Sequence, residues 1–511
     1  MYELLSNLNP KKASGCDNVP PKLIKLGAKE LCCHVTKLVN MSIVSSKFPS
    51  MYKYANVSPI YKKDDAMLKK SYRPVSVLPC MSKIFEKVMI DQLNIYFENV
   101  FNDFVSGFRK GHSCDTVLLR FIENVKSVLD DGKMMGALLM DLSKAFDCLP
   151  HKLLISKFHA YGVDINSCTL LASYFRDRYQ RVKIGCHSSQ WLGIGKGAPQ
   201  GSYMGPFAYN VQTNDLLYLI MNVCQIFNYA DDNTICSSAS HIDDIKVNIE
   251  QQAMICNAWF ANNYMKVNAD KFQAIIFETR NVTNVCFKID GQDIEAQDEV
   301  KLLGITFDKQ LKFDTHVGNI CRKAGRQLSV LKRLSNVLDK EGKLLVYNTF
   351  IFSNFNYCAI VWHCSTMLSA KKLEKIQERA LRYVFNDHET SYEQLLLMSD
   401  KSLLYVNRLR SMLQFVYKIL HHNVPLYLNN MFSQDVVIHN TRCHMKVIQP
   451  TFNTMLHGYN SICYQGSKLW NAIPNNIKQC QSYKSFKYEL SKWNGMKCEC
   501  MNCMKCKLYH I

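Results

Sequence analysis

Residues 226–235 read IFNYADDNTI: an apolar run, two adjacent aspartates, and a second short run that becomes apolar again at Thr234 and Ile235. This pattern predicts two strands joined by a tight turn, with Asp231 and Asp232 at the tip. Aspartate is also common at such tips because it tolerates turn geometry, so a purely structural hairpin is an alternative interpretation of the same segment.

A third aspartate weakens the structural alternative. The segment GALLMDL, residues 136–142, is apolar up to Asp141, which is typical of a buried strand that ends in a carboxylate. Neighbouring carboxylates repel one another and raise each other's pKa unless a cation neutralises them. Magnesium prefers oxygen ligands, and two ions about 4 Å apart can activate a hydroxyl and stabilise a leaving phosphate. The sequence therefore indicates a site for two Mg²⁺ ions at these aspartates.

The composition favours an intracellular protein that binds a polyanion. The chain has 511 residues, enough for two or three packed regions, and 62 Lys and Arg against 43 Asp and Glu give a net charge of +19. Nucleic acid fits this excess better than a membrane does, although a generic basic protein fits the charge equally well. The sequence shows no signal peptide and no apolar run of membrane-spanning length. We expect no secretion, a nuclear and/or cytoplasmic location, and reduced thiols for the 22 cysteines.

Hydrophobic periodicity predicts helices and strands mixed without strict alternation, which favours an α+β fold over a doubly wound sheet. Helices are expected at 22–45, at 76–97, from Asp115 as a possible N-cap, from Pro150, at 206–219 and at 243–264. Strands are expected at 136–142, in a hairpin over 181–195, beside the aspartate pair, and in KFQAIIF, VCFKI and KLLGITF.

After His316 the chain becomes helical and basic. The segment CRKAGRQLSVLKRL, residues 321–334, places Cys321, Ala324, Leu328 and Leu331 on one face and its cations elsewhere. The segment KKLEKIQERALRYVF, residues 371–385, repeats this design. Such helices suit a nucleic-acid backbone, and a helical scaffold with solvated lysines explains them equally well.

Eight ordered segments resemble motifs of reverse transcriptases. MDLSKAFDCLPH (140–151) and IFNYADDNTI resemble the metal-binding strands of that family, and GAPQGSYMGPFAYNVQTNDL between them resembles its PQG motif. Upstream, KKASGCDNVPPKLIK, the segment from FPSMYKYANVSPIYKK to SYRPVSVLPCMSKIFEKVM, and FVSGFRKGHSC resemble fingers motifs of non-LTR retrotransposons of the jockey-like and CR1-like kind. WFANNYMKVNADKFQAIIF and VKLLGITFDKQLKFDTHV resemble the last two palm motifs, so the resemblance covers about residues 8 to 320.

The resemblance implies which residues hold the metal ions. Asp141 and Asp231 would be the principal ligands, and Asp232 would be the third carboxylate. The backbone carbonyl of Leu142 would be an additional ligand.

The resemblance also implies how the nucleotide is bound. Lys62 and Arg73 would close over the triphosphate and neutralise its oxygens, unless they are simply exposed loop residues. Phe146 would lie under the ribose, where it would clash with a 2′-hydroxyl and so select deoxynucleotides. By itself Phe146 also fits an ordinary core phenylalanine.

Two glycine-containing motifs would contact the nucleic acid. Gln200 and Gly201 would contact the nascent base pair, or would form a structural turn only. Leu303 and Gly304 would position the primer end, although Leu303 also fits core packing.

The fold implied by the resemblance is a right-hand polymerase with fingers at 1–135, a palm with an antiparallel sheet at 136–318, a helical thumb at 319–430 and a helical C-terminal extension at 431–511. This RNA-directed DNA polymerase would bind an RNA template, a DNA primer, their heteroduplex and deoxynucleoside triphosphates. The alternatives are an inactive remnant that binds RNA, an RNA-dependent RNA polymerase, against which Phe146 argues, and a structural helical scaffold.

Two features at the ends of the chain carry separate expectations. Met1 stands almost directly before the first fingers motif, so we expect the chain to lack the endonuclease of complete elements. The tail KCECMNCMKCKLYHI contains Cys498, Cys500, Cys503, Cys506 and His510. Its spacing leaves no loop between ligand pairs, which favours a disordered, reduced tail over a zinc site.

Overall fold

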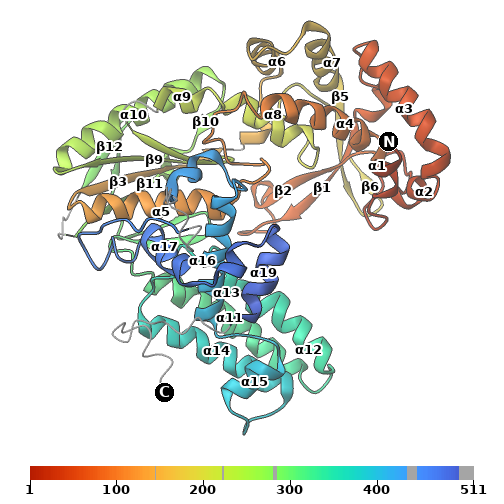
Figure 1. Ribbon diagram of the computed structural model, residues 1–511. Helices are drawn as coiled ribbons and strands as arrows, with labels where there is room; N and C mark the ends of the chain where they lie inside the picture. The colour runs from red at the N-terminus through yellow and green to blue at the C-terminus, as the bar shows by residue number, and fades with distance from the viewer. Residues whose placement is uncertain (144, 221–223, 280–284, 434–445, 494–511) are drawn as a thin grey trace.

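A four-stranded antiparallel sheet in the order β11–β3–β9–β8 forms the centre of the protein (Figure 1). The structure is a computed structural model that describes residues 1–143, 145–220, 224–279, 285–433 and 446–493. The strands of the central sheet are β3 (Met134–Met140), β8 (Gln225–Tyr229), β9 (Asp232–Ala239) and β11 (Gln273–Phe277). The strands predicted at 136–142 and on both sides of the aspartate pair are therefore confirmed, and β3 pairs directly with β9.

Helices cover both faces of this sheet, with α10 (Ile242–Asn262) on one face and α5 (Cys114–Asp130) on the other (Figure 1). Because β3 is buried on both sides, its sequence is almost continuously apolar. The fit against α10 is close: a Cβ at Gly136 would lie 2.5 Å from Ile245 and 2.8 Å from Ile249. The mixture of helices and an antiparallel sheet confirms the α+β prediction.

The helix predicted to begin at Asp115 begins one residue earlier, and its N-cap is Ser113. The Ser113 hydroxyl accepts the Thr116 backbone N–H at 3.3 Å, and the Thr116 hydroxyl accepts the Ser113 backbone N–H at 3.0 Å. This reciprocal arrangement satisfies two free donors at the start of the helix. Asp115 lies in the first turn, so its prediction as the N-cap was wrong.

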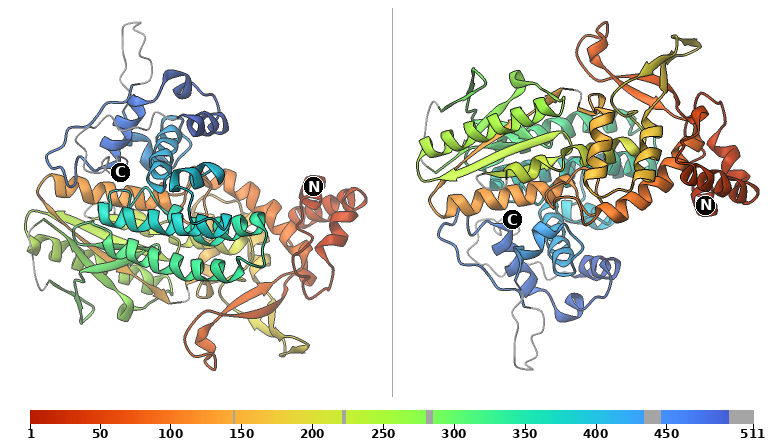
Figure 2. Two further views of the ribbon diagram at one scale, coloured as in Figure 1. Left: turned by 90° about the horizontal axis from the view of Figure 1, so that it is seen from below. Right: turned by 90° about the horizontal axis from the view of Figure 1, so that it is seen from above.

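A second sheet lies away from the central sheet, beside the N-terminal helices (Figure 2). Its strands are β1 (Tyr54–Tyr61), β2 (Tyr72–Val77), β5 (Arg178–Ile184), β6 (His187–Ser188) and β7 (Leu192–Ile194). The strand β1 pairs antiparallel with β2 and parallel with β5, and the hairpin predicted over 181–195 is confirmed. The neighbouring helices are α1 (Tyr2–Ser6), α2 (Pro21–Leu26), α3 (Ala28–Val44) and α4 (Cys80–Phe97).

Three short two-stranded sheets surround the central sheet. They pair β4 (Leu142–Ser143) with β10 (Lys266–Val267), β12 (Cys286–Ile289) with β13 (Gln292–Glu295), and β14 (Glu299–Leu302) with β15 (Ile305–Asp308). The segment KLLGITF is therefore not one strand, as predicted, but a hairpin. Leu303 and Gly304 have φ angles of +45° and +85°, and this left-handed backbone reverses the chain.

The helices α6 (His151–Ala160), α7 (Ile165–Phe175) and α8 (Met204–Thr213) lie between the two sheets, whereas α9 (Leu216–Ile220) packs against α10 and β8. The predicted helix from Pro150 is confirmed, and the helix predicted at 206–219 is present as α8 and α9. The glycine-rich turn at residues 197–203 leads into α8, which lies under the tip of the β8–β9 hairpin.

The C-terminal part is helical, as predicted (Figure 1). Its longer helices are α11 (Asp314–Leu334), α14 (Met367–Phe385), α16 (Leu404–Leu420), α17 (Ile462–Ala472) and α19 (Tyr483–Lys492). Its shorter helices are α12 (Lys340–Val346), η5 (Tyr347–Phe352), α13 (Ser353–Asn356), α15 (Tyr392–Met398), η6 (Leu426–Met431) and α18 (Asn475–Lys478). Ala324, Leu328 and Leu331 of α11 are buried, whereas the arginines and lysines of α11 are exposed.

None of the helices in the described ranges is both long and apolar enough to cross a membrane. The cysteine-rich tail, with its candidate zinc ligands, lies outside the described residues.

Candidate active site

The tip of the β8–β9 hairpin presents Asp231 and Asp232 at the surface. Tyr229 pairs with Asp232, so only Ala230 and Asp231 connect the two strands. Ala230 has a φ angle of +54°, a left-handed conformation that is uncommon for a residue with a side chain. Such a conformation persists only where the surrounding structure enforces it.

Two buried asparagines enforce this turn. The Asn228 side-chain amide donates to the Ala230 carbonyl at 3.0 Å and to the Asn233 side-chain oxygen at 2.8 Å. The Asn233 amide donates to the Asp231 carbonyl at 3.3 Å. The two asparagines face each other across the strands, so they fix the turn from inside the hairpin.

Asp141 follows the last residue of β3, and β3 carries it to the same place. Met140 pairs with Asn233, so the next step along the two strands brings Asp141 opposite Asp232. Residues directly opposite in an antiparallel pair project to the same face of the sheet. The Lys271 ammonium donates to the Asp141 carboxylate at 3.0 Å; the Lys271 side chain is largely exposed and the Asp141 side chain is partly exposed.

The carboxylates affect one another electrostatically. Burial and, after it, the charges of Asp231 and Asp141 together raise the pKa of the Asp232 carboxyl to about 6. The Asp232 side chain is exposed to solvent at the tip. A cation at this position would relieve the repulsion among the three groups.

Tyr209 of α8 lies beneath the aspartates. Its side chain is fully buried, and burial together with the charges of Asp231 and Asp232 raises the pKa of the Tyr209 hydroxyl far above its ordinary value. Within the described part of the chain this hydroxyl has no hydrogen-bond partner. The Phe146 ring packs on Tyr209 with 4.8 Å between ring centroids and meets Phe108 edge-on at 5.8 Å. Phe146 is therefore half-buried between the core and the surface.

The loop that contains Gly107 supports the hairpin tip from another side. A Cβ at Gly107 would lie 2.6 Å from the Ala230 backbone nitrogen and 2.9 Å from the Ala230 Cα, so only glycine fits there. The Asn210 side-chain amide donates to the Gly107 carbonyl at 2.7 Å and fixes the loop to α8. The tip is thus supported by α8 and by this loop together.

The PQG turn connects the two sheets. The Gln200 carbonyl accepts the Ser76 backbone N–H at 2.7 Å, and the Gln200 side-chain amide donates to Asp147 at 2.9 Å. Gly201 has a φ angle of +118°, and a Cβ there would lie 2.9 Å from the Ser76 carbonyl oxygen. Close approach of β2 therefore requires glycine at this position.

Lys62 and Arg73 lie at the exposed end of the β1–β2 hairpin. The Lys62 backbone N–H donates to the Ser71 carbonyl at 2.8 Å, which extends the pairing beyond Tyr61. Arg73 pairs with Ile60, and residues two apart on a strand share a face. The Lys62 and Arg73 side chains therefore project to the same side of the hairpin.

Leu303 and Gly304 form the tip of the β14–β15 hairpin. Leu303 is half-buried against the core, and its carbonyl accepts the Tyr357 hydroxyl at 2.7 Å. A Cβ at Gly304 would lie 3.3 Å from the Tyr357 ring. The tip is thus anchored to the helical C-terminal part.

The aspartate carboxylates and the Leu142 carbonyl fit a magnesium site in part. Within the described ranges no three His, Cys, Asp or Glu side chains are close enough to hold one ion by themselves. Magnesium usually takes only one or two carboxylates and completes its shell with water and substrate phosphates. The backbone carbonyl of Asp141 accepts the Asn268 N–H, so these two residues form a hydrogen-bonded pair. The next pair, Leu142 with Val267, is therefore not hydrogen-bonded, and the Leu142 carbonyl points away from β10.

Sequence reasoning missed several residues that support the site. Asn228 and Asn233 did carry a signal, because they are polar residues at matching positions of two otherwise apolar strands. Tyr209 and Lys271 carried none, since their proximity to the aspartates depends on how α8 and the segment before β11 pack.

Comparison with known proteins agrees with these motifs. Residues 60–307 match the family model "Reverse transcriptase (RNA-dependent DNA polymerase)". "Probable RNA-directed DNA polymerase from transposon BS" of Drosophila melanogaster is 27% identical over 404 residues, which cover 75% of this chain and 44% of that protein. "RNA-directed DNA polymerase from mobile element jockey" of Drosophila funebris is 25% identical over 397 residues, which cover 75% of this chain and 43% of that protein.

Residues 60–307 therefore belong to the reverse transcriptase family. The relatives that the chain matches include RNA-directed DNA polymerases from transposon BS, transposon X-element and mobile element jockey. The chain spans less than half the length of these curated relatives.

Proposed function

We propose that this chain is an RNA-directed DNA polymerase that extends a primer 3′-hydroxyl with deoxynucleotides on an RNA template. The observation that carries the proposal is the meeting of Asp141 with the Asp231–Asp232 turn at the end of two neighbouring central strands. The names of the relatives support the same reaction. Pyrophosphate is the leaving group.

Asp141, Asp231 and Asp232, with the Leu142 carbonyl, would hold two Mg²⁺ ions. When bound, the ions activate the attacking hydroxyl and stabilise charge on the leaving phosphate. The Asn228–Asn233 pair keeps the carboxylates in place, so little reorganisation is needed as charge develops.

The remaining motif residues bind and orient substrates. Lys62 and Arg73 neutralise the triphosphate, and their shared face on a protruding hairpin suits closure over it. Gln200 and Gly201 contact the nascent base pair through a turn fixed to β2. The tip formed by Leu303 and Gly304 positions the primer end.

Replacing Phe146 by valine is expected to increase the use of ribonucleotides relative to deoxynucleotides by roughly 10- to 100-fold. The ring is held by Tyr209 and Phe108, so it is a rigid obstacle to a 2′-hydroxyl. The measurement is kcat/KM for dTTP and for UTP on the same template. Tyr54→Val is a control, because Tyr54 is half-buried in the other sheet. An unchanged ratio in Phe146→Val would show that Phe146 is only a packing residue.

We assign residues 1–135 to fingers, 136–318 to a palm, 319–430 to a helical thumb and 431–511 to an extension. The exposed cations of α11 and α14 would follow the backbone of an RNA/DNA heteroduplex, and such binding weakens as salt rises. The expected location is the nucleus and/or cytoplasm, where the thiols would stay reduced.

Primer extension by the purified chain tests the proposal. We expect magnesium-dependent incorporation of dTTP on poly(rA)/oligo(dT), with little use of UTP. Salt-sensitive RNA binding without any incorporation would identify an inactive remnant instead. Preference for UTP would identify an RNA-dependent RNA polymerase.

A further inference from the structure

The end of the helical C-terminal part, from η6 onward, is attached along α5, the helix that covers one face of the central sheet. Five polar side chains of α5 contact the segment between residues 427 and 463: Thr116, Arg120, Glu123, Lys126 and Asp130. Their spacing of three or four residues places them on one face of the helix. Glu123 accepts the backbone N–H groups of Ile462 and Cys463 at 2.7 and 3.0 Å, and Asp130 accepts two more from residues 453–454. This end of the helical C-terminal part is therefore included in the folded core around α5.

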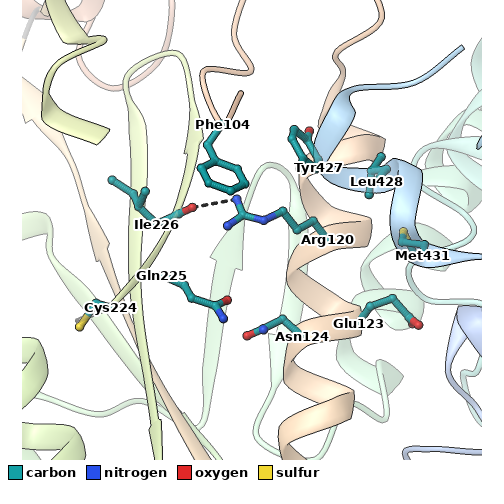
Figure 3. Close-up of a pocket in the computed structure, with 10 residues that line it drawn as sticks. All are labelled: Phe104, Arg120, Glu123, Asn124, Cys224, Gln225, Ile226, Tyr427, Leu428 and Met431. Carbon is teal, nitrogen blue, oxygen red and sulfur yellow. Dashed lines mark hydrogen bonds between the residues drawn. The ribbon is translucent and has the colours of Figure 1, made fainter. Parts of the chain in front are cut away.

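Arg120 is the member of this row that also touches the catalytic hairpin (Figure 3). Its guanidinium donates to the Ile226 carbonyl of β8 at 2.9 Å. The guanidinium also lies over the Phe104 ring at 3.8 Å, the Phe227 ring at 4.4 Å and the Tyr427 ring at 5.5 Å. Arg120 thus joins β8, the loop before α5 and the helical C-terminal part of the chain at one point.

The bond from Arg120 gives a hydrogen-bond partner to an outward-pointing carbonyl of β8. This strand is at the edge of the sheet, and among the described residues β9 is its one strand partner. Counting back from the Tyr229–Asp232 pair that closes the turn, Ile226 and Ile235 form a non-hydrogen-bonded pair, so the Ile226 carbonyl points outward. The outward N–H and C=O groups of an edge strand have no strand partner and must find another one. Arg120 binds the Ile226 carbonyl, which stands four residues before Ala230, the first residue of the turn.

The charge of Arg120 has no acidic counterpart in the part of the chain that the structure describes. Burial lowers the pKa of its guanidinium to about 10, so it remains charged at neutral pH. The rings compensate for some of the lost hydration. Tyr427 is itself held in place, because its hydroxyl lies 3.2 Å from the Thr116 hydroxyl and 3.3 Å from that of Ser106. The cation is therefore fixed by its neighbours and not by an ion pair.

We propose that Arg120 is a positioning residue that holds the edge of the catalytic hairpin in register, and that Tyr427 makes the helical C-terminal part of the chain a member of this support. The inference rests on the proposed polymerase function of Asp231. The cavity beside Arg120, of about 380 Å³, is lined by Glu123, Gln225 and Met431 among others and opens to solvent (Figure 3). Small cations can therefore reach the space that the guanidinium occupies.

The test uses Arg120→Ala in the full chain. We expect kcat for dTTP incorporation to fall about 10-fold while the affinity for template–primer stays within about twofold, because the change displaces the hairpin and not the nucleic-acid surface. Millimolar methylguanidinium should restore part of the lost kcat by occupying the vacated space. The matched control is Arg410→Ala, since Arg410 also donates to a backbone carbonyl, that of Ser491, but does so far from the sheet.

Hydrogen exchange gives a second measurement that needs no activity. Amides of residues 225–239 should exchange at least about twofold faster in Arg120→Ala, while those of α10 stay unchanged. If Arg120→Ala does not fold, Phe104→Leu removes only the nearest ring and is expected to change the same amides in the same direction.

The outcomes separate this inference from the proposed function. A wild-type chain without incorporation would reject the polymerase proposal, while exchange would still decide the role of Arg120. Unchanged kcat and unchanged exchange in a folded variant would reject the role of Arg120. A loss of kcat equal to that of Arg410→Ala and insensitive to methylguanidinium would reject it as well.

Discussion

Replacing Asp231 by alanine is expected to reduce primer extension by several orders of magnitude without unfolding the protein, because metal-mediated charge stabilisation carries most of the barrier reduction. Asp231 is exposed at the turn and contributes no side-chain packing. Its charge also raises the pKa of Asp232, so its removal relieves repulsion in the folded state. Activity and stability should therefore respond in different directions.

The measurement is magnesium-dependent dTTP incorporation on poly(rA)/oligo(dT), with thermal unfolding recorded in parallel. Asp231→Asn keeps the size of the side chain and should be as inactive as Asp231→Ala. The matched control is Asp243→Ala, which removes an exposed carboxylate in the first turn of α10 and should leave incorporation close to wild type. Substantial activity in a folded Asp231→Ala protein would contradict the proposed site.

Replacing Gly107 by alanine is expected to lower kcat about 100-fold or more, although Gly107 bears no functional group. The new Cβ would lie 2.6 Å from the Ala230 nitrogen, so loop and turn must separate by about 1 Å to reach ordinary contact. The other neighbours are backbone atoms and the Ala230 Cβ, which cannot rotate away. The displacement therefore acts directly on the turn that carries Asp231.

Gly195→Ala is the control, since a Cβ at Gly195 would have no atom within 4 Å. Comparing kcat and template–primer affinity for both variants separates displacement of the aspartates from a loss of nucleic-acid binding. Wild-type kcat in Gly107→Ala would mean that the turn tolerates a shift of this size.

Most elements of the fold could be predicted from sequence because their hydrophobic patterns are strong. The strand before Asp141 is almost continuously apolar, and α11 alternates buried and exposed faces clearly. The errors occurred where short-range geometry decides the outcome. KLLGITF has the composition of one strand, but two residues with positive φ turn it into a hairpin. Likewise, Ser113 caps α5 through a reciprocal bond with Thr116, a partner that the prediction from Asp115 overlooked.

The candidate site shows the same division. Motif order predicted Asp141, Asp231 and Asp232 as the site residues without any coordinates. It did not identify Arg120, because a lone arginine on a helix resembles any solvated cation until the helix is packed against β8. It also could not identify Gly107 as a contact of Ala230, since the two residues are far apart in the chain.

The sequence by itself determined the class of protein: ordered motifs with carboxylates at the ends of apolar strands encode local structure and chemistry, which depend on nearby residues. Only the tertiary structure decided what fixes those carboxylates. The Asn228–Asn233 pair, the Gly107 contact and the Arg120 bond join segments distant in the chain, and such contacts arise from packing and edge pairing that no local pattern specifies.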